Sequence, residues 1–291
     1  MPVGEGCWVM PEIRDASTDD DVRVEAWDAG SLVGHASARP VQLFHDERFC
    51  SVEVVPDRRR EGIGTTLYAA VDALVPTREW LICRMLHSDH AESGFVESIG
   101  YELIELCPAP IADPSDTAWR RWVAHQPLPA GAQVVRSDAV PEADLESAFV
   151  DYYVWAHEMI GPLRPRADVA VASRGLASAL DHDASTLVLR EGRIVALSLV
   201  FRPEEGSTTR ILAETTRAVE PDGSQLVAGA IAGTLDVLGR RGVALVELEG
   251  RTFDPHLPAV FASFPPHASN PMSVVRLQRR PLSHPSATMT R

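Results

Sequence analysis

The chain has 291 residues, of which 45% are hydrophobic and 23% charged, a globular composition long enough for about two domains. All 27 basic residues are arginine, and the absence of lysine excludes a Schiff-base lysine enzyme and a P-loop nucleotidase. The net charge of −14 disfavours a nucleic-acid partner, because an acidic surface repels the phosphate backbone. That charge suits a cationic substrate, or it serves solubility alone.

The chain shows no sign of a membrane or secretory segment. No apolar run approaches the ~20 residues of a membrane helix, and residues 1–15 lack the basic and apolar regions of a secretory signal. The four cysteines, Cys7, Cys50, Cys83 and Cys107, form no C-x-x-C pair and have no zinc-like spacing. We therefore expect reduced thiols in a cytoplasmic protein, with no metal and no membrane partner.

The first half of the chain predicts strands followed by a helix. Leu67, Ala70, Val71 and Leu74 follow helical spacing, and alternating or Val-rich runs bounded by turn residues predict the strands. In chain order we expect a hairpin of strands at 21–27 and 32–44, a strand at 48–55, a helix at 64–75, a strand at 79–86, a helix at 91–99 and a strand at 101–106.

The second half repeats this order after a stretch rich in Pro, Ala, Gly and Asp at 108–132, which is typical of a linker. Within it, 117–124 could be a short helix or strand. We expect a strand at 133–137, helices at 141–159 and 167–180, a hairpin at 186–203 turning at Glu191-Gly192, a strand at 208–219, a helix at 225–239, strands at 243–250 and 273–280, and a disordered tail at 281–291. The repeated order indicates two copies of one fold, at 1–128 and 129–291.

The segment between a predicted strand and a predicted helix, residues 54–67, has the pattern of a phosphate-binding loop. Between the strand ending at Val55 and the helix opening at Gly64, Arg59, Gly62 and Gly64 fit the spacing Arg-x-x-Gly-x-Gly. The first N–H groups of a helix lack intrahelical partners, and the helix dipole adds partial positive charge there. Glycines let a pyrophosphate approach the backbone, and the arginines at 58–60 add cations. The alternative is an ordinary tight turn with a solvated arginine run.

In this strand–turn–helix context the motif resembles the acetyl-CoA-binding segment of the GCN5-related N-acetyltransferase (GNAT) superfamily. Residues 92–103 resemble the later element of that family, a helix, a glycine, an aromatic residue and a strand. The whole chain resembles the tandem form, which implies an α/β (α+β) fold of two mixed, mostly antiparallel sheets flanked by helices. The resemblance implies that the residues binding acetyl-CoA are Val54, Val55, Arg59, Arg60, Glu61, Gly62, Ile63, Gly64, Thr65 and Thr66.

Each copy departs from the family pattern. Aligning Pro221 with Pro56 puts Ser224 opposite Arg59, Val227 opposite Gly62 and Gly229 opposite Gly64. We therefore expect the C-terminal copy to bind acetyl-CoA poorly or not at all. The N-terminal copy has only residues 1–20 before its hairpin, too few for the first strand and two helices of the family. The second copy has such helices at 141–180, so we infer that it scaffolds or completes the acceptor pocket.

The resemblance also implies direct attack of an amine on the thioester. Glu53 matches the position of the family's general base, and the alternative is a solvated strand glutamate. The backbone N–H of Val54 or Val55 would stabilise the oxyanion. Val96 stands where the family has the tyrosine that acts as general acid. We therefore consider His87 and Ser88 as the groups that take part in acid–base catalysis. Residues 87–90 could instead be a solvated loop, or they could form a metal site that includes His90.

The helix at 141–159 gathers aromatic residues, namely Tyr152, Tyr153, Trp155 and His157. They either pack in the core or line an acceptor pocket, in which Asp151 or Glu158 could hold an amine. We expect an N-acetyltransferase that moves an acetyl or short acyl group to a primary amine of a small, cationic metabolite or antibiotic, with homodimerisation possible. The alternative is a non-catalytic acyl-CoA-binding or regulatory protein.

Overall fold

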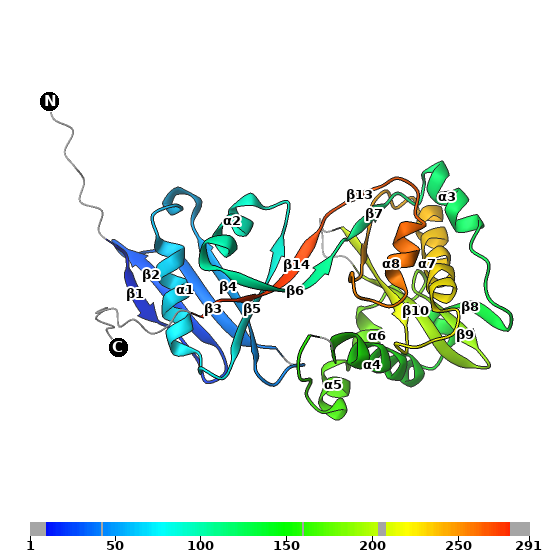
Figure 1. The fold of residues 1–291 in the computed structure, drawn as a ribbon, viewed down its shortest axis with the longest axis horizontal. Coiled ribbons are helices and arrows are strands. Elements are labelled where there is room, and N and C mark those ends of the chain that lie inside the picture. Colours follow the sequence, from blue (N-terminus) through cyan, green and yellow to red (C-terminus); the bar gives the residue numbers. More distant parts are fainter. Residues whose placement is uncertain (1–9, 42, 159, 203–207, 280–291) are drawn as a thin grey trace. The chain divides into compact units, whose positions relative to one another are not determined.

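The computed structural model describes residues 10–41, 43–158, 160–202 and 208–279, and it divides into two compact units (Figure 1). Unit 1 takes residues up to 84, 91–103 and those from 274, and unit 2 takes 85–90 and 104–273. The division thus differs from a single boundary at residue 128, because strands distant in sequence complete each sheet. The expected disordered tail at 281–291 lies outside the described residues.

Unit 1 is a sheet with helices on one face. Within the described residues the sheet has seven strands in the order β1-β2-β3-β4-β5-β14-β6. The strands are β1 (Glu12–Asp15), β2 (Val22–Asp28), β3 (Ser31–Pro40), β4 (Glu47–Val54), β5 (Trp80–Leu86), β6 (Tyr101–Cys107) and β14 (Met272–Leu277), with a 3-10 turn at Pro56–Arg58 and helices α1 (Ile63–Leu74) and α2 (His90–Ile99).

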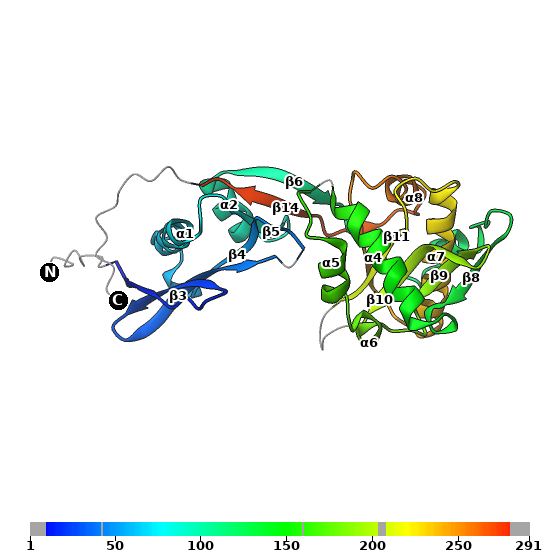
Figure 2. The ribbon, with the colours of Figure 1, turned by 90° about the horizontal axis from the view of Figure 1, so that it is seen from below.

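The alternation of side chains along β2, β3 and β4 decides which face carries the helices. Ala36 pairs with Val24 on one side and with Val52 on the other, so these side chains share a face. Leu67 and Val71 of α1 are fully buried, and α1 and α2 lie on one side of the sheet in both ribbon views (Figures 1 and 2). In the part of unit 1 that is described, no helix covers the opposite face.

The sheet of unit 1 includes β14, the last strand of the chain, between β5 and β6. Arg279, just after it, donates to Asp72 Oδ1 at 2.6 Å. The same guanidinium also donates to backbone carbonyls of Asp72, Val75, Pro76 and Glu79 at 2.6–2.9 Å. It therefore satisfies carbonyls at the C-terminal end of α1, which lack helical partners.

Unit 2 has a second seven-stranded sheet over its described residues, in the order β13-β7-β12-β11-β10-β9-β8. Its strands are β7 (Pro110–Ala112), β8 (Ala132–Arg136), β9 (Thr186–Arg190), β10 (Arg193–Phe201), β11 (Thr209–Thr215), β12 (Val246–Glu249) and β13 (Ala268–Ser269). Its helices are α3 (Thr117–Ala124), α4 (Glu142–Glu158), α5 (Arg166–Ala172), α6 (Leu176–Ala179), α7 (Gly223–Arg240) and α8 (Leu257–Ala262).

Several of these elements correct the sequence expectations. The expected linker contributes β7 to the sheet between β12 and β13, and α3 packs Trp119 and Trp122 into the core beside α7. The helix expected at 167–180 is divided at Gly175, whose φ of 80° is left-handed. Helices cover both faces of this sheet, α7 on one and α4 on the other.

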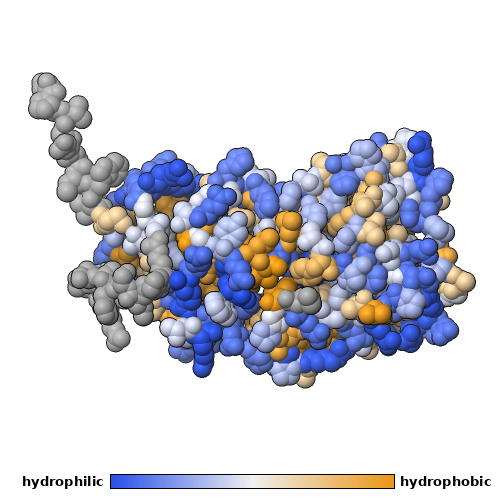
Figure 3. Space-filling view, viewed as in Figure 1, coloured by the Kyte–Doolittle hydropathy of each residue, from blue (hydrophilic) through white to orange (hydrophobic). Residues whose placement is uncertain are grey.

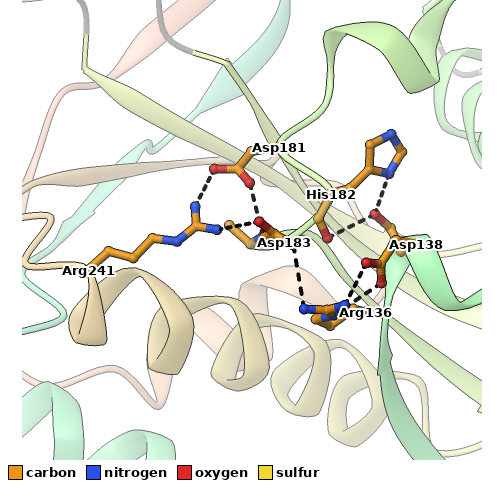
Figure 4. A network of polar contacts seen from close by, with 8 residues as sticks. Arg136, Asp138, Asp181, His182, Asp183 and Arg241 are labelled. Atoms are coloured by element: carbon orange, nitrogen blue, oxygen red, sulfur yellow. Dashed lines mark hydrogen bonds and ion pairs between the residues drawn. The ribbon is translucent and has the colours of Figure 1, made fainter.

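A polar network fastens the edge of unit 2 (Figure 4). Arg136 bonds Asp138 at 2.6 Å and reaches Asp183 at 3.5 Å, while Arg241 bonds both Asp181 and Asp183. These contacts join the end of β8, the turn before β9 and the C-terminal end of α7. The groups are partly exposed, so we assign the network to structure.

Hydrophilic residues dominate the face drawn in Figure 3, with some apolar residues among them. None of the helices in the described residues is both long and apolar enough to cross a membrane. Cys50, Cys83 and Cys107 are free and buried, whereas Cys7 lies outside the described residues. Burial raises the pKa of Cys50 and of Cys83 to about 12, so these thiols stay protonated and weakly nucleophilic.

Candidate functional site

Strands β4 and β5 separate toward the loop that leads into α1. They are parallel and paired only from Glu47–Trp80 to Phe49–Ile82, although β4 continues to Val54 and β5 to Leu86. The backbone of β4 beyond Phe49 is therefore not bridged to β5. This opening lies directly before the Arg-x-x-Gly-x-Gly segment.

The loop between β4 and α1 presents a row of unbonded amides. Within the described residues, the N–H groups of residues 60–65 have no intramolecular acceptor, and the next amide, of Thr66, donates to Gly62 O at 3.0 Å. Successive free N–H groups at the positive end of a helix bind phosphate oxygens. Residues 60–65, which we call the cradle, can therefore hold an anion.

The two glycines of the cradle have different roles. Gly62 precedes α1 with a φ of 82°, and a Cβ built on it would meet no atom within 4 Å. Its lack of a side chain thus allows the left-handed turn and leaves open space. A Cβ on Gly64 would lie 3.2 Å from the ring of Phe95 on α2, so Gly64 permits close packing of α1 and α2.

The three consecutive arginines also differ. Arg58 bonds Asp28 at 2.5 Å and Glu61 at 2.8 Å, so its charge is used within the protein, and so is the carboxylate of Glu61. Arg59 donates from Nε to the carbonyl of Val54 at 3.0 Å. Arg59 and Arg60 are exposed. Of the cations expected to serve phosphates, these two are placed to do so.

Of the two backbone N–H groups considered at the end of β4, those of Val54 and Val55, the structure leaves one available. Val55 donates its N–H to Val33 O at 3.0 Å, so this amide is already bonded. Because bonding alternates along an antiparallel pair, Val54 directs its N–H away from β3, toward the opening beside β5. Val54 is therefore the donor that the strand end supplies.

Glu53 lies on the sheet face opposite α1, next to Val54. Its side chain is 72% exposed, and its carboxylate lies 4.0 Å from Nε2 of His35. His35 is the cross-strand partner of Glu53 on β3. Sequence reasoning missed His35, because its alignment with Glu53 depends on the register of two strands rather than on a local motif.

His87 and Ser88 do not join Glu53 within unit 1. His87 Nε2 lies 2.8 Å from Ser273 Oγ, and Ser88 Oγ lies 3.1 Å from Asn270 Oδ1. Both belong to the segment that unit 2 includes, residues 85–90. Among the residues that the structure describes, no three or more His, Cys, Asp or Glu side chains form a group that could hold a metal ion.

The aromatic residues of α4 pack in the hydrophobic core of unit 2 and on one another. Tyr152 is buried, and Tyr153 stacks on His157 with ring centroids 3.9 Å apart. His157 in turn lies 2.8 Å from Arg251. Asp151, which we considered as an amine-binding group, forms an ion pair with Arg166.

The counterpart of the cradle in unit 2 lies where the loop between β11 and α7 leads into the helix. That loop spans residues 216–222, because β11 ends at Thr215 and α7 begins at Gly223. Counted from the helix start, Ser224 stands opposite Gly64. The alignment of Gly229 with Gly64 was therefore wrong, since Gly229 lies well inside α7, where a Cβ would meet Leu128 at 2.4 Å.

Comparison with known proteins gives a likeness in structure. No family model and no curated protein matches the sequence. A GCN5-related N-acetyltransferase from Sphaerobacter thermophilus superposes with a TM-score of 0.60 at 16% identity, over 90% of this chain and 81% of that one. A tandem GNAT protein from the clavulanic acid biosynthesis pathway gives 0.63 at 15% identity, over 96% and 86%.

The chain has the tandem GNAT fold. The expected α/β architecture of two mixed sheets flanked by helices is confirmed. The cradle with its free row of amides belongs to unit 1, and the described residues of that unit form no helix on one face of the sheet. The second unit keeps such helices as α4, α5 and α6.

Proposed function

We propose that this protein is a CoA-dependent N-acyltransferase that moves an acetyl or other short acyl group to a primary amine. The observation that carries the proposal is the row of free amides at residues 60–65, directly beside the separated strands β4 and β5. The tandem GNAT fold supports it.

The residues of the cradle fit the pyrophosphate of acetyl-CoA. The amides of residues 60–65 would bind its oxygens, and Arg59 and Arg60 would balance its charge. The space around Gly62 leaves room for the phosphates to approach. When bound, acetyl-CoA supplies an acetyl group activated as a thioester.

Two groups of β4 then serve the transfer. The exposed carboxylate of Glu53 would accept, directly or through a water, the proton that the acceptor's ammonium must lose before its amine can attack. The C–N bond then forms as the C–S bond of the thioester breaks, and CoA leaves as its thiolate. The N–H of Val54 donates to the oxygen that becomes negative during the transfer. A cationic acceptor is favoured by the net charge of −14, and a small amine metabolite or aminoglycoside-type antibiotic has that chemistry.

A non-catalytic acyl-CoA-binding or regulatory protein is the second candidate. Two observations favour it. The side chain of Glu53 is 72% exposed, and the buried Val96 in α2 stands where the resemblance implies a tyrosine that acts as general acid. On this hypothesis the cradle holds its ligand without turnover.

The test is release of the CoA thiol from acetyl-CoA in the presence of a polyamine, an aminoglycoside or a peptide with a free amino terminus. We expect turnover on at least one, and a fall in kcat of about 10²–10³-fold in Glu53→Gln, with the Kd for acetyl-CoA unchanged. Glu12→Gln, a matched change at an exposed strand residue of unit 1, should retain activity. Binding without turnover on any amine would favour the second candidate, and a fully active Glu53→Gln would remove Glu53 as the base.

A further inference from the structure

The start of α7 in unit 2 is closed by the chain's own His256. A Cβ built on Gly223, the first residue of α7, would lie 2.1 Å from Nε2 of His256. The imidazole therefore packs directly on the backbone at the helix start, which only a glycine allows. In unit 1 the space around Gly62 is open to 4 Å.

The backbone amides at the start of α7 are also less available to a ligand than those at the start of α1. Gly223, Gln225 and Leu226 donate their N–H groups to carbonyls of the preceding turn at 2.9–3.1 Å. In α1 the counterparts of Gly223 and Gln225, the amides of Ile63 and Thr65, have no acceptor within the described structure, whereas the amide of Thr66, the counterpart of Leu226, is also bonded. The start of α7 thus offers fewer free donors to an anion than the cradle does.

His256 is held in place by Glu214, which is fully buried. Glu214 Oε1 lies 2.8 Å from His256 Nδ1 and accepts the N–H of Thr215 at 2.7 Å. Its other oxygen accepts the N–H of Leu257 at 3.3 Å. Glu214 is the penultimate residue of β11, as Glu53 is of β4, so unit 2 places a carboxylate at the equivalent strand position.

This arrangement has a defined electrostatic effect. A buried carboxylate needs hydrogen-bond donors and positive potential to remain ionised. A carboxylate oxygen accepts, so its contact with Nδ1 of His256 assigns the ring proton to Nδ1. In that tautomer the lone pair of Nε2 faces the start of α7. That end of a helix carries partial positive charge. The negative charge of Glu214 is therefore coupled to α7 through the imidazole.

We propose that the Glu214–His256 pair is an internal substitute for a phosphate anion at the start of α7, so that unit 2 binds no CoA. The same pair explains why glycine occurs at position 223 although the phosphate-binding pattern is otherwise lost. This closure concerns unit 2 alone and does not depend on whether unit 1 is an acyltransferase.

The first test uses the unaltered protein. Nitrogen-15 NMR of labelled histidine, assigned with His256→Gln, should show His256 at neutral pH as a neutral ring with its proton on Nδ1. A protonated Nε2, in either the other neutral tautomer or the imidazolium, would overturn the proposal, because Nε2 could then no longer accept at the positive helix end.

The second test removes the imidazole. Calorimetry with inorganic pyrophosphate should find one more binding site in folded His256→Ala than in the wild type, while His125→Ala, at an exposed histidine of unit 2, should match the wild type. An unchanged number of sites in folded His256→Ala would overturn the proposal, as would acetyl-CoA bound at both units of the wild type. If the wild type binds no acetyl-CoA, the proposed function fails, but the difference between the variants still decides this inference.

Discussion

Neighbouring residues of one chemical type have different roles at the cradle. Arg58 braces the loop through Asp28 and Glu61, and Arg59 reaches the end of β4. Arg60 takes a left-handed φ of 68° and is exposed. The chemistry of a guanidinium is the same in all three, so the partners that the fold supplies decide which charges remain for a ligand.

Replacing Arg58 and Arg60 one at a time should separate the residue that stabilises the loop from the residue that binds phosphate. Arg60→Gln should weaken acetyl-CoA binding and flatten its salt dependence, because a cation facing phosphate is lost. Arg58→Gln should lower the Tm, because the loop loses its ties to Asp28 and Glu61, and should leave the salt dependence unchanged. Calorimetry at low and high salt, with thermal melts, measures both. Equal flattening in the two variants would contradict the distinction.

Asp254 in unit 2 gives a pH-dependent contribution to stability. Burial raises its pKa to about 6, against the pull of nearby Arg251. The folded protein therefore holds a proton that the unfolded chain has lost between about pH 4 and pH 6, so this contribution to the unfolding free energy falls as pH rises through that range. In Asp254→Asn the free energy of unfolding should fall by about 3 kcal/mol less over this pH range than in the wild type. Denaturant unfolding across this pH range measures it, and identical pH profiles of the two proteins would exclude it.

At the scale of elements, the last strand of the chain completes the sheet of unit 1. Arg279 then fastens the segment after β14 to the carbonyls that end α1. A charged donor with several acceptors cannot be removed without leaving those carbonyls unsatisfied. Unit 1 therefore depends on residues from the far end of the sequence.

Arg279→Ala should lower the free energy of unfolding by about 2–4 kcal/mol, because charged hydrogen bonds to partly buried carbonyls are lost. Urea unfolding followed by circular dichroism measures this change. Arg240→Ala, at a side chain that is 65% exposed and paired within one helix, should change stability far less. A similar, small effect of both substitutions would show that β14 is held by its strand pairing alone.

Elements defined by local patterns could be predicted from the sequence, and those defined by distant partners could not. The period of Leu67 and Val71 gave α1, and Glu191-Gly192 gave a hairpin turn whose φ angles are 52° and 74°. The insertion of β14 and β7 into their sheets depends on segments far apart in the chain. The short helix α8 has no long periodic pattern, and it was missed.

The same limit applies to the candidate site. The spacing of Arg59, Gly62 and Gly64 predicts a phosphate-binding loop, and the structure has free backbone amides there, because the loop's geometry is contained in a few consecutive residues. The pairing of Glu53 with His35 needed the strand register. The closure of α7 by His256 needed a contact with Gly223 that no local pattern encodes.

At the scale of the whole molecule, the two units have diverged in opposite directions. Unit 1 keeps an open cradle and has no helices on one face of its described sheet. Unit 2 keeps helices on both faces and fills its own helix start with His256. We therefore expect one acetyl-CoA for each chain, bound by unit 1.

Calorimetric titration with acetyl-CoA tests this most directly, on the wild type, on Arg59→Ser with Gly62→Val, and on Gly242→Val. Gly242 is a matched control, because it has a left-handed φ of 72° with no atom within 4 Å of a built Cβ and lies in unit 2. We expect one saturable site in the wild type and in Gly242→Val, and its loss in the double variant. Two sites in the wild type, or binding that survives the change at the cradle, would contradict this account.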